Sequence, residues 1–319
     1  MYRGTRRLKN GSSMKMRVVS FFDLLDQYIR EKPLAEATIK TYRGVVNRFV
    51  SDTNIISLDK ITFEALLDWR LDVVGRSSDI TWNNYLRHMR ALWKFAMMRD
   101  YVPGIDIFKE LNWGKYKSSK IKTLSQDQLK EIVDYLDTRE CSLDPGWFWE
   151  MVIRFIYYTG VRRKQLVNLK WGDLELQNRM LRLDAIGEKT DIHRELPLRR
   201  DLILYLEAYR NRVHHEVPGA CHNHKQLFNI TLHNSRYEGE LMNVTQLSGF
   251  FKRLSKKTGF AVSSHRLRHT MADEIVRKTG QIKHVQEILG HNNVKTTIDF
   301  YLHPNLSQIE TMLCELSSI

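Results

Sequence analysis

Five residues in the second half of the chain have side chains that could together bind a phosphodiester and attack it. They are two arginines, two histidines and a tyrosine, in the order Arg162, His265, Arg268, His291 and Tyr301. Arginine is always charged and can hold two phosphate oxygens in its planar fork. A tyrosine hydroxyl can form a covalent ester with phosphorus, and a histidine can carry a proton near neutral pH. Because negative charge builds on the phosphorus during attack, such a reaction needs cations already in place.

The sequence around these residues predicts the elements that position them. An apolar helix runs into Thr159-Gly160, which places Arg162 at a helix junction. His265 and Arg268 are three residues apart, so we expect them on one face of a second helix. A third helical pattern ends at Gly290, a residue typical of a helix C-cap, and delivers the following histidine to the same place.

A change of hydrophobic period predicts a β-hairpin in this otherwise helical region. Apolar and polar residues alternate from Leu181 to Ala185 and again from Ile192 to Leu196, with a turn at residues 187–191. Lys189 lies in that turn. We therefore expect a mainly α fold with a small antiparallel β-sheet.

The charge of the chain points to a polyanionic partner. Its 50 basic and 37 acidic residues give a net charge of +13. Residues 1–120 hold 22 basic and 13 acidic residues, a net +9, whereas the remainder holds 28 and 24, a net +4. We therefore expect the first third of the chain to clamp the polyanion by electrostatic attraction. Residues 1–16 are polar and basic, and we expect a flexible N-terminal segment there.

Apolar residues recur at helical spacing from Ser20 to about Asp100 and predict a domain of four helices. Two of these helices turn basic and amide side chains outward at intervals of three and four residues, which puts them on one face. A charged helix face is often only solvated, but in this basic region it is suited to lie along a DNA backbone. The predicted DNA-binding residues are Lys40, Arg43, Asn47, Asn83, Arg87, Arg90 and Lys94, with Lys115 and Lys117 beyond the last helix.

The segment after Pro103-Gly104 is rich in lysine and predicts a flexible linker over residues 105–122, able to track a duplex. The expected organisation is therefore a basic segment (1–16), a helical DNA-binding domain (17–104), the linker (105–122) and a catalytic domain with a C-terminal tail helix (123–319).

At the residues that could do chemistry, the chain resembles the tyrosine recombinase, or phage integrase, family of site-specific recombinases. The resemblance spans roughly residues 17 to 310. It is carried by Thr159-Gly160-Val161-Arg162, by the quartet from His265 to Arg268, by Leu289-Gly290-His291 and by Tyr301 ten residues later. It implies an N-terminal helical core-binding domain of the SAM-like type and a C-terminal catalytic domain with the DNA breaking-rejoining fold.

The resemblance also implies a role for each residue. Arg162, Arg268 and His291 would bind the scissile phosphate, and His265 would handle a proton or orient the nucleophile. Tyr301 would be the nucleophile and would form a 3′-phosphotyrosyl link. Lys189 would protonate the departing 5′ oxygen, since residues 194–198 (Arg-Glu-Leu-Pro-Leu) resemble the strand that follows the family's lysine.

One position departs from the family pattern. An acidic residue usually follows the first arginine by three positions, whereas this chain has Gln165. Glutamine can accept a hydrogen bond but brings no charge. The support of Arg162 and the pH profile of the reaction are therefore left open.

The resemblance further implies partners. They are double-stranded DNA with a specific recombination site, a homotetramer on synapsed DNA, and accessory directionality or DNA-bending proteins. The purpose would be integration, excision or resolution of a genetic element. No cofactor and no metal are expected, because arginines do the electrostatic work. Apolar residues at helical spacing in 305–316 predict a tail that packs either on its own subunit or on a neighbour.

Three other interpretations stay open. A topoisomerase IB-like enzyme would share the tyrosine chemistry, and a catalytically silent DNA-binding relative would keep only the basic helices. Histidines and a cysteine crowd residues 214–224, but a metal site there would need further ligands.

The longest apolar run, around residues 147–158, contains two charges, so no membrane helix is expected. Three widely separated cysteines favour a reduced cytoplasmic location. The resemblance implies that the protein acts on the nucleoid of a prokaryotic host.

Overall fold

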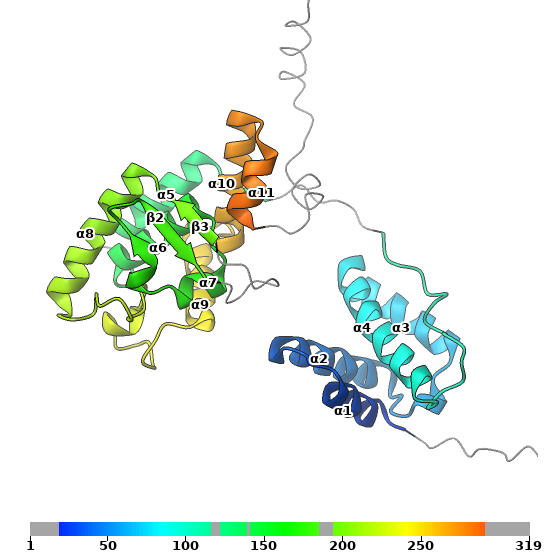
Figure 1. Ribbon diagram of the computed structural model, residues 1–319. Coiled ribbons are helices and arrows are strands. Elements are labelled where there is room, and N and C mark those ends of the chain that lie inside the picture. Colours follow the sequence, from blue (N-terminus) through cyan, green and yellow to red (C-terminus); the bar gives the residue numbers. More distant parts are fainter. Residues whose placement is uncertain (1–18, 116–121, 139–140, 185–193, 291–319) are drawn as a thin grey trace, which may run out of the picture. The chain divides into compact units, whose positions relative to one another are not determined.

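The computed structural model describes residues 19–115, 122–138, 141–184 and 194–290. The chain divides into two compact units, one ending at Ser119 and the other beginning at Lys120 (Figure 1). The predicted segment 1–16 and the predicted tail helix lie outside the described residues.

Within residues 19–115, the N-terminal unit contains the four α-helices that the sequence predicts. They are α1 (Phe21–Glu31), α2 (Glu36–Thr53), α3 (Phe63–Arg76) and α4 (Asp79–Met98), with a short 3-10 helix at Leu58–Lys60. Their core is aromatic: the ring of Phe49 lies 4.9 Å from both Phe21 and Trp69, and Trp69 lies 5.4 Å from Trp82. Such edge-on ring pairs stabilise a small core beyond the area they bury.

The segment that follows α4 belongs to this unit as far as residue 115. Phe108 and Leu111 are buried in its core. The indole nitrogen of Trp82 donates to the carbonyl of Asn112 at 3.0 Å, and that of Trp93 donates to the carbonyl of Ile105 at 3.0 Å. The prediction of a flexible linker over 105–122 is therefore wrong for residues 105–115. Buried indole N–H groups need acceptors, and this backbone supplies them.

The C-terminal unit is built around α6 (Gly146–Thr159), which is apolar on nearly all sides. Trp149 of α6 is fully buried and stacks on Phe250 with ring centres 3.9 Å apart. The helices described around α6 are α5 (Gln126–Asp137), α7 (Arg163–Asn168), α8 (Arg200–Glu216), α9 (Val244–Thr258), α10 (Ser264–Thr279) and α11 (Ile282–Leu289), with 3-10 helices at Trp171–Asp173 and Ile230–Leu232.

The described residues of this unit also form a three-stranded antiparallel sheet in the order β1-β2-β3. The strands are β1 (Leu174–Glu175), β2 (Met180–Leu183) and β3 (Arg194–Pro197). In β2 and β3, Leu181 pairs with Leu196 and Leu183 pairs with Arg194. This pairing confirms the predicted hairpin and the predicted fold class, mainly α with a small antiparallel sheet. The turn that carries Lys189 lies outside the described residues.

None of the helices in the described part of the chain combines the length and the apolar character that crossing a lipid bilayer requires.

Candidate active site

Arg162 lies at the junction between α6 and α7. Helix α6 ends at Gly160, whose φ of 64° is in the left-handed region. This left-handed conformation favours glycine, which has no Cβ to strain. Two residues later, Arg162 is the N-cap of α7. The predicted helix junction at Arg162 is confirmed.

Gln165 supports Arg162 through the backbone. Its side chain is buried, and its Oε1 atom accepts a hydrogen bond from the backbone N–H of Arg162 at 2.9 Å. A carboxylate at this position could accept the same bond, because the acceptor is an oxygen in both cases. The departure from the family pattern therefore removes a charge but preserves this contact.

Arg268 lies on α10 and is almost fully buried, with 3% of its surface exposed. Its guanidinium donates to the backbone carbonyls of Gly160, at the end of α6, and of Leu289, at the end of α11. A buried charge needs such hydrogen bonds to offset its lost hydration. This arginine therefore joins two helix ends that are far apart in sequence.

The end of α11 is where the two predicted phosphate-binding arginines meet. Arg162 donates from Nη2 to the carbonyl of Gly290 at 2.8 Å, next to the Leu289 carbonyl that Arg268 holds. Gly290 has a φ of 58° and forms the C-cap of α11, as predicted. His291, Tyr301 and Lys189 lie outside the described residues, and their places in the site stay predictions.

His265 lies one helical turn before Arg268 on α10. Partial loss of hydration, followed by the positive charges of Arg163, Arg268 and Arg162, lowers the pKa of His265 below its usual value. Burial and the nearby His265 and Arg268 lower the pKa of His269 to about 4. Both imidazoles are therefore neutral at neutral pH, which leaves His265 able to accept a proton.

Helix α10 is held in place by hydrogen bonds to the start of α5 and to α6. The backbone N–H of Leu124 donates to Thr270 Oγ1 at 2.9 Å. Glu274 accepts from Gln126 at 3.1 Å and from the hydroxyl of Tyr157. Burial and the bond to Glu274 raise the pKa of Tyr157 to about 12, so its hydroxyl stays protonated and can donate. Helix α11 packs beside α10 (Figure 1).

The phage integrase family model matches residues 122–308, which is more than half of the chain. The chain belongs to the phage integrase family. Among curated relatives, tyrosine recombinase XerD of Listeria innocua is 27% identical over 296 residues, covering 88% of this chain and 94% of that protein. A protein of Pseudomonas syringae that carries the name tyrosine recombinase XerC is 27% identical over 313 residues. That match covers 94% of this chain but 65% of the relative, so the chain spans about two thirds of its length.

Solved integrase structures share the fold. The integrase of transposon Tn1549, in complex with a circular intermediate DNA, matches with a TM-score of 0.75 and 18% identity, covering 92% of this chain and 98% of that chain. A lambda integrase dimer bound to a COC' core site matches with a TM-score of 0.68 and 16% identity, covering 88% of this chain and 76% of that chain. At these identities the likeness establishes the integrase fold.

Two residues that interact with the predicted site were missed by sequence reasoning. Arg163 donates from Nη1 to Ser248 Oγ on α9 at 2.8 Å and helps to lower the pKa of His265. Arg194 of β3 donates to carbonyls of α11. The pairing of β2 with β3 involves residues close in sequence and could be predicted. The contacts of Arg163 and Arg194 are with residues more than 80 positions away, and no local pattern predicts them.

In the N-terminal unit, two of the predicted DNA-binding residues hold the segment after α4. Arg90 donates from Nε to the carbonyl of Phe108 at 2.9 Å, and its guanidinium lies 4.7 Å from the ring centre of Trp113. Asn83 exchanges two hydrogen bonds with the backbone of Gly114, at 2.7 and 3.2 Å. These side chains have a structural role that the sequence did not predict.

The other described members of that set are exposed: Lys40, Arg43, Asn47, Arg87, Lys94 and Lys115. Arg43 lies 3.9 Å from the carboxylate of Asp26, and both of these side chains are largely solvated. Lys117 lies outside the described residues. DNA contact by these residues stays a prediction.

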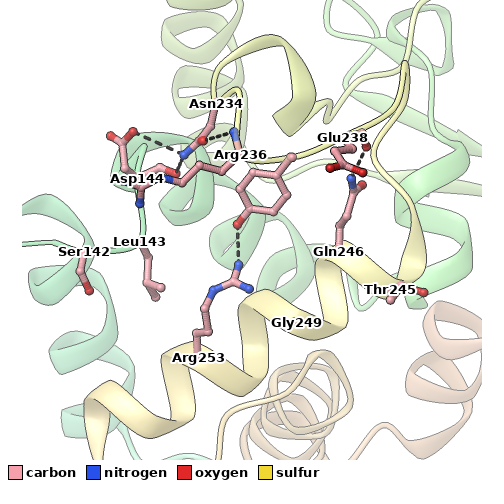
Figure 2. A pocket seen from close by; sticks show the side chains of 11 residues that line it. Ser142, Leu143, Asp144, Asn234, Arg236, Glu238, Thr245, Gln246, Gly249 and Arg253 are labelled. Carbon is pink, nitrogen blue, oxygen red and sulfur yellow. Dashed lines mark hydrogen bonds between the residues drawn. The ribbon is translucent and has the colours of Figure 1, made fainter.

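A cavity of about 480 Å³ is lined on one side by residues of α9 (Figure 2). Arg253 of α9 lines it and donates to the hydroxyl of Tyr237, another lining residue, at 2.5 Å. Neither Arg162 nor His265 nor Arg268 lines the cavity, so it is separate from the candidate active site.

The sequence drew attention to the histidine-rich residues 214–224 as a possible metal site. The described parts of the chain contain no cluster of three or more histidine, cysteine, aspartate or glutamate side chains that could hold a metal ion.

Proposed function

We propose that this protein is a tyrosine-type site-specific DNA recombinase, which cuts and rejoins DNA through a 3′-phosphotyrosyl intermediate. The observation that carries the proposal is the convergence of Arg162 and Arg268 on the end of α11, at residues 289 and 290. His291 follows directly in the sequence. Two guanidinium groups that are always charged, both bonded to one short stretch of backbone, suit the binding of a phosphate.

In the proposed reaction, the hydroxyl oxygen of Tyr301 attacks the phosphorus and its proton passes to neutral His265. The bond from phosphorus to the 5′ oxygen breaks, and that oxygen takes a proton from Lys189. Arg162, Arg268 and His291 stabilise the charge that builds on the phosphoryl oxygens. The ester conserves the phosphate bond, so the 5′ hydroxyl of a partner strand can reverse the step without ATP.

We infer that the partner is double-stranded DNA with a specific recombination site, as the DNA-bound integrases of the same fold support. The active assembly is a homotetramer on two synapsed duplexes, with room for accessory directionality or DNA-bending proteins. The net charge of +9 in residues 1–120 and the exposed basic face of α2 and α4 support DNA binding. The widely separated cysteines support action in a reducing cytoplasm. Recombination of DNA would place the protein on the nucleoid of a prokaryotic host.

The test is covalent trapping on DNA nicked near the scissile phosphate, spanning the junction of the element that carries the gene. Wild type, Tyr301→Phe and a control, Tyr205→Phe, are compared in EDTA. Tyr205 is a partly exposed tyrosine on α8, beside Arg154. We expect a denaturant-stable protein–DNA adduct from wild type and Tyr205→Phe but not from Tyr301→Phe. Tight binding without any adduct would favour the catalytically silent relative, and relaxation of supercoiled DNA lacking the site would favour the topoisomerase.

A further inference from the structure

The end of α11 accepts hydrogen bonds from arginines of three different elements. Four successive carbonyl oxygens take part. Arg194 of β3 donates from Nη1 to Glu287 at 2.8 Å and to Ile288 at 3.1 Å, Arg268 of α10 donates to Leu289, and Arg162 donates to Gly290 at 2.8 Å. Two of these arginines are the proposed phosphate-binding residues, and Arg194 is not.

Arg194 also occupies the space beside Gly290. An ideal Cβ at Gly290 would lie 2.4 Å from the Cζ atom of Arg194 and 2.5 Å from its Nη1 atom. The guanidinium therefore lies against the backbone where any other residue would place its side chain. Gly290 is favoured both by its positive φ and by this close approach.

Helix α11 needs such support because it has only eight residues. A helix this short is marginal by itself, and its last carbonyls have no partners within the helix. Val285 and Leu289 bury one face against α10, but this apolar contact does not fix the polar end. Positive charge at a helix C-terminus is favourable, and a guanidinium bonded to two carbonyls adds direction to that attraction.

We propose that Arg194 is a positioning residue for the strand-cleavage reaction. By holding the last turn of α11, it fixes Gly290 relative to Arg162 and Arg268. The chain continues from Gly290 to His291 and Tyr301. This proposal rests on the proposed function. In it, Arg194 acts through the backbone of α11 and makes no contact with DNA.

The first arm of the test compares Arg194→Ala with Arg182→Ala. Arg182 is on β2 of the same sheet and pairs with Glu175 and Glu195, with 56% of its side chain exposed, so its loss changes the charge equally without touching α11. We expect Arg194→Ala to cleave saturating DNA about 100-fold more slowly than wild type, the scale of loss for a small misplacement of reacting groups. Its Kd for DNA stays at the wild-type value. We expect Arg182→Ala to match wild type in both quantities.

A weaker Kd with an unchanged rate at saturation would overturn the proposal, because it would make Arg194 a direct DNA contact. Arg194→Lys separates geometry from charge. Lysine keeps the charge but has no planar guanidinium to lie against Gly290, so we expect it to stay more than about 10-fold below wild type. Full activity in Arg194→Lys would show that charge alone suffices and would also overturn the proposal.

The second arm needs no catalysis. Hydrogen exchange is measured on DNA-free protein for peptides that contain the last turn of α11, where the Gly290 amide bonds to Gln286 and Glu287. We expect faster exchange there in Arg194→Ala than in wild type or Arg182→Ala, with unchanged exchange in α6 as the check on folding. Unchanged exchange in α11 would sink the proposal. If wild type forms no adduct on DNA, the proposed function fails, and this arm still decides whether Arg194 holds α11.

Discussion

Replacing Arg268 by lysine should destabilise the C-terminal unit even when no DNA is present. The guanidinium is 3% exposed and bridges the carbonyls of Gly160 and Leu289. A lysine ammonium retains the charge but cannot span both acceptors in the same plane, so one buried carbonyl loses a charged donor. Loss of one such bond costs about 1.5–3 kcal/mol of the free energy of unfolding.

For a unit of this size, that cost lowers Tm by roughly 2–4 °C per kcal/mol, or about 3–12 °C in all. Scanning calorimetry of the whole chain measures it, with Arg266→Lys as the control. Arg266 is on the same helix and donates to the carbonyl of Ala261 at 2.9 Å in an exposed setting, so we expect a change within about 0.5 kcal/mol. Equal Tm values for Arg268→Lys and wild type would refute the bridging role of Arg268.

Three further outcomes are expected. Gly290→Ala should reduce adduct formation and Tm more than the control Gly280→Ala. Both glycines are helix C-caps with positive φ, but only Gly290 faces a guanidinium. Equal changes in Tm, measured by calorimetry, would contradict the close approach of Arg194 to Gly290. Gln165→Met should lower the free energy of unfolding by about 1–3 kcal/mol in denaturant titration, since the partly buried backbone N–H of Arg162 loses the acceptor that Gln165 supplies. A neutral result would contradict the support of Arg162. The cleavage rate should fall with decreasing pH only below the usual histidine pKa of about 6.5, because the pKa of His265 is lowered and its neutral form is the base; a midpoint above that value in the pH–rate profile would exclude this assignment.

The sequence predicted most of the secondary structure because its signals are local. The capping boxes at Ser20 and Ser125 begin α1 and α5, and glycine C-caps end α6 and α11. The alternation around Leu181 and Leu196 is visible within a few residues, and the antiparallel pairing confirms it. Each of these features depends on neighbours in the chain.

What the sequence could not predict depends on contacts between distant residues. Arg268 bonds to Gly160, 108 positions away, and Arg194 bonds to Glu287, 93 positions away. The lysines after α4 suggested a linker, whereas Phe108 is buried by packing against a helix whose position no local pattern gives. Residue types singled out Arg162 and Arg268, which converge on the end of α11, but only tertiary packing shows that Arg194 also bonds there.

The central claim is that Tyr301 becomes covalently attached to a DNA 3′ phosphate. Trypsin cleaves after Lys295, and residues 296–319 contain no lysine or arginine, so Tyr301 lies in a peptide that begins at Thr296, and it is the single tyrosine of residues 296–319. The direct measurement is mass spectrometry of the trapped adduct after digestion with trypsin and nuclease. The account predicts a nucleotide joined through its 3′ phosphate to Tyr301 in this peptide. A nucleotide on any other residue, or joined through a 5′ phosphate, would contradict it.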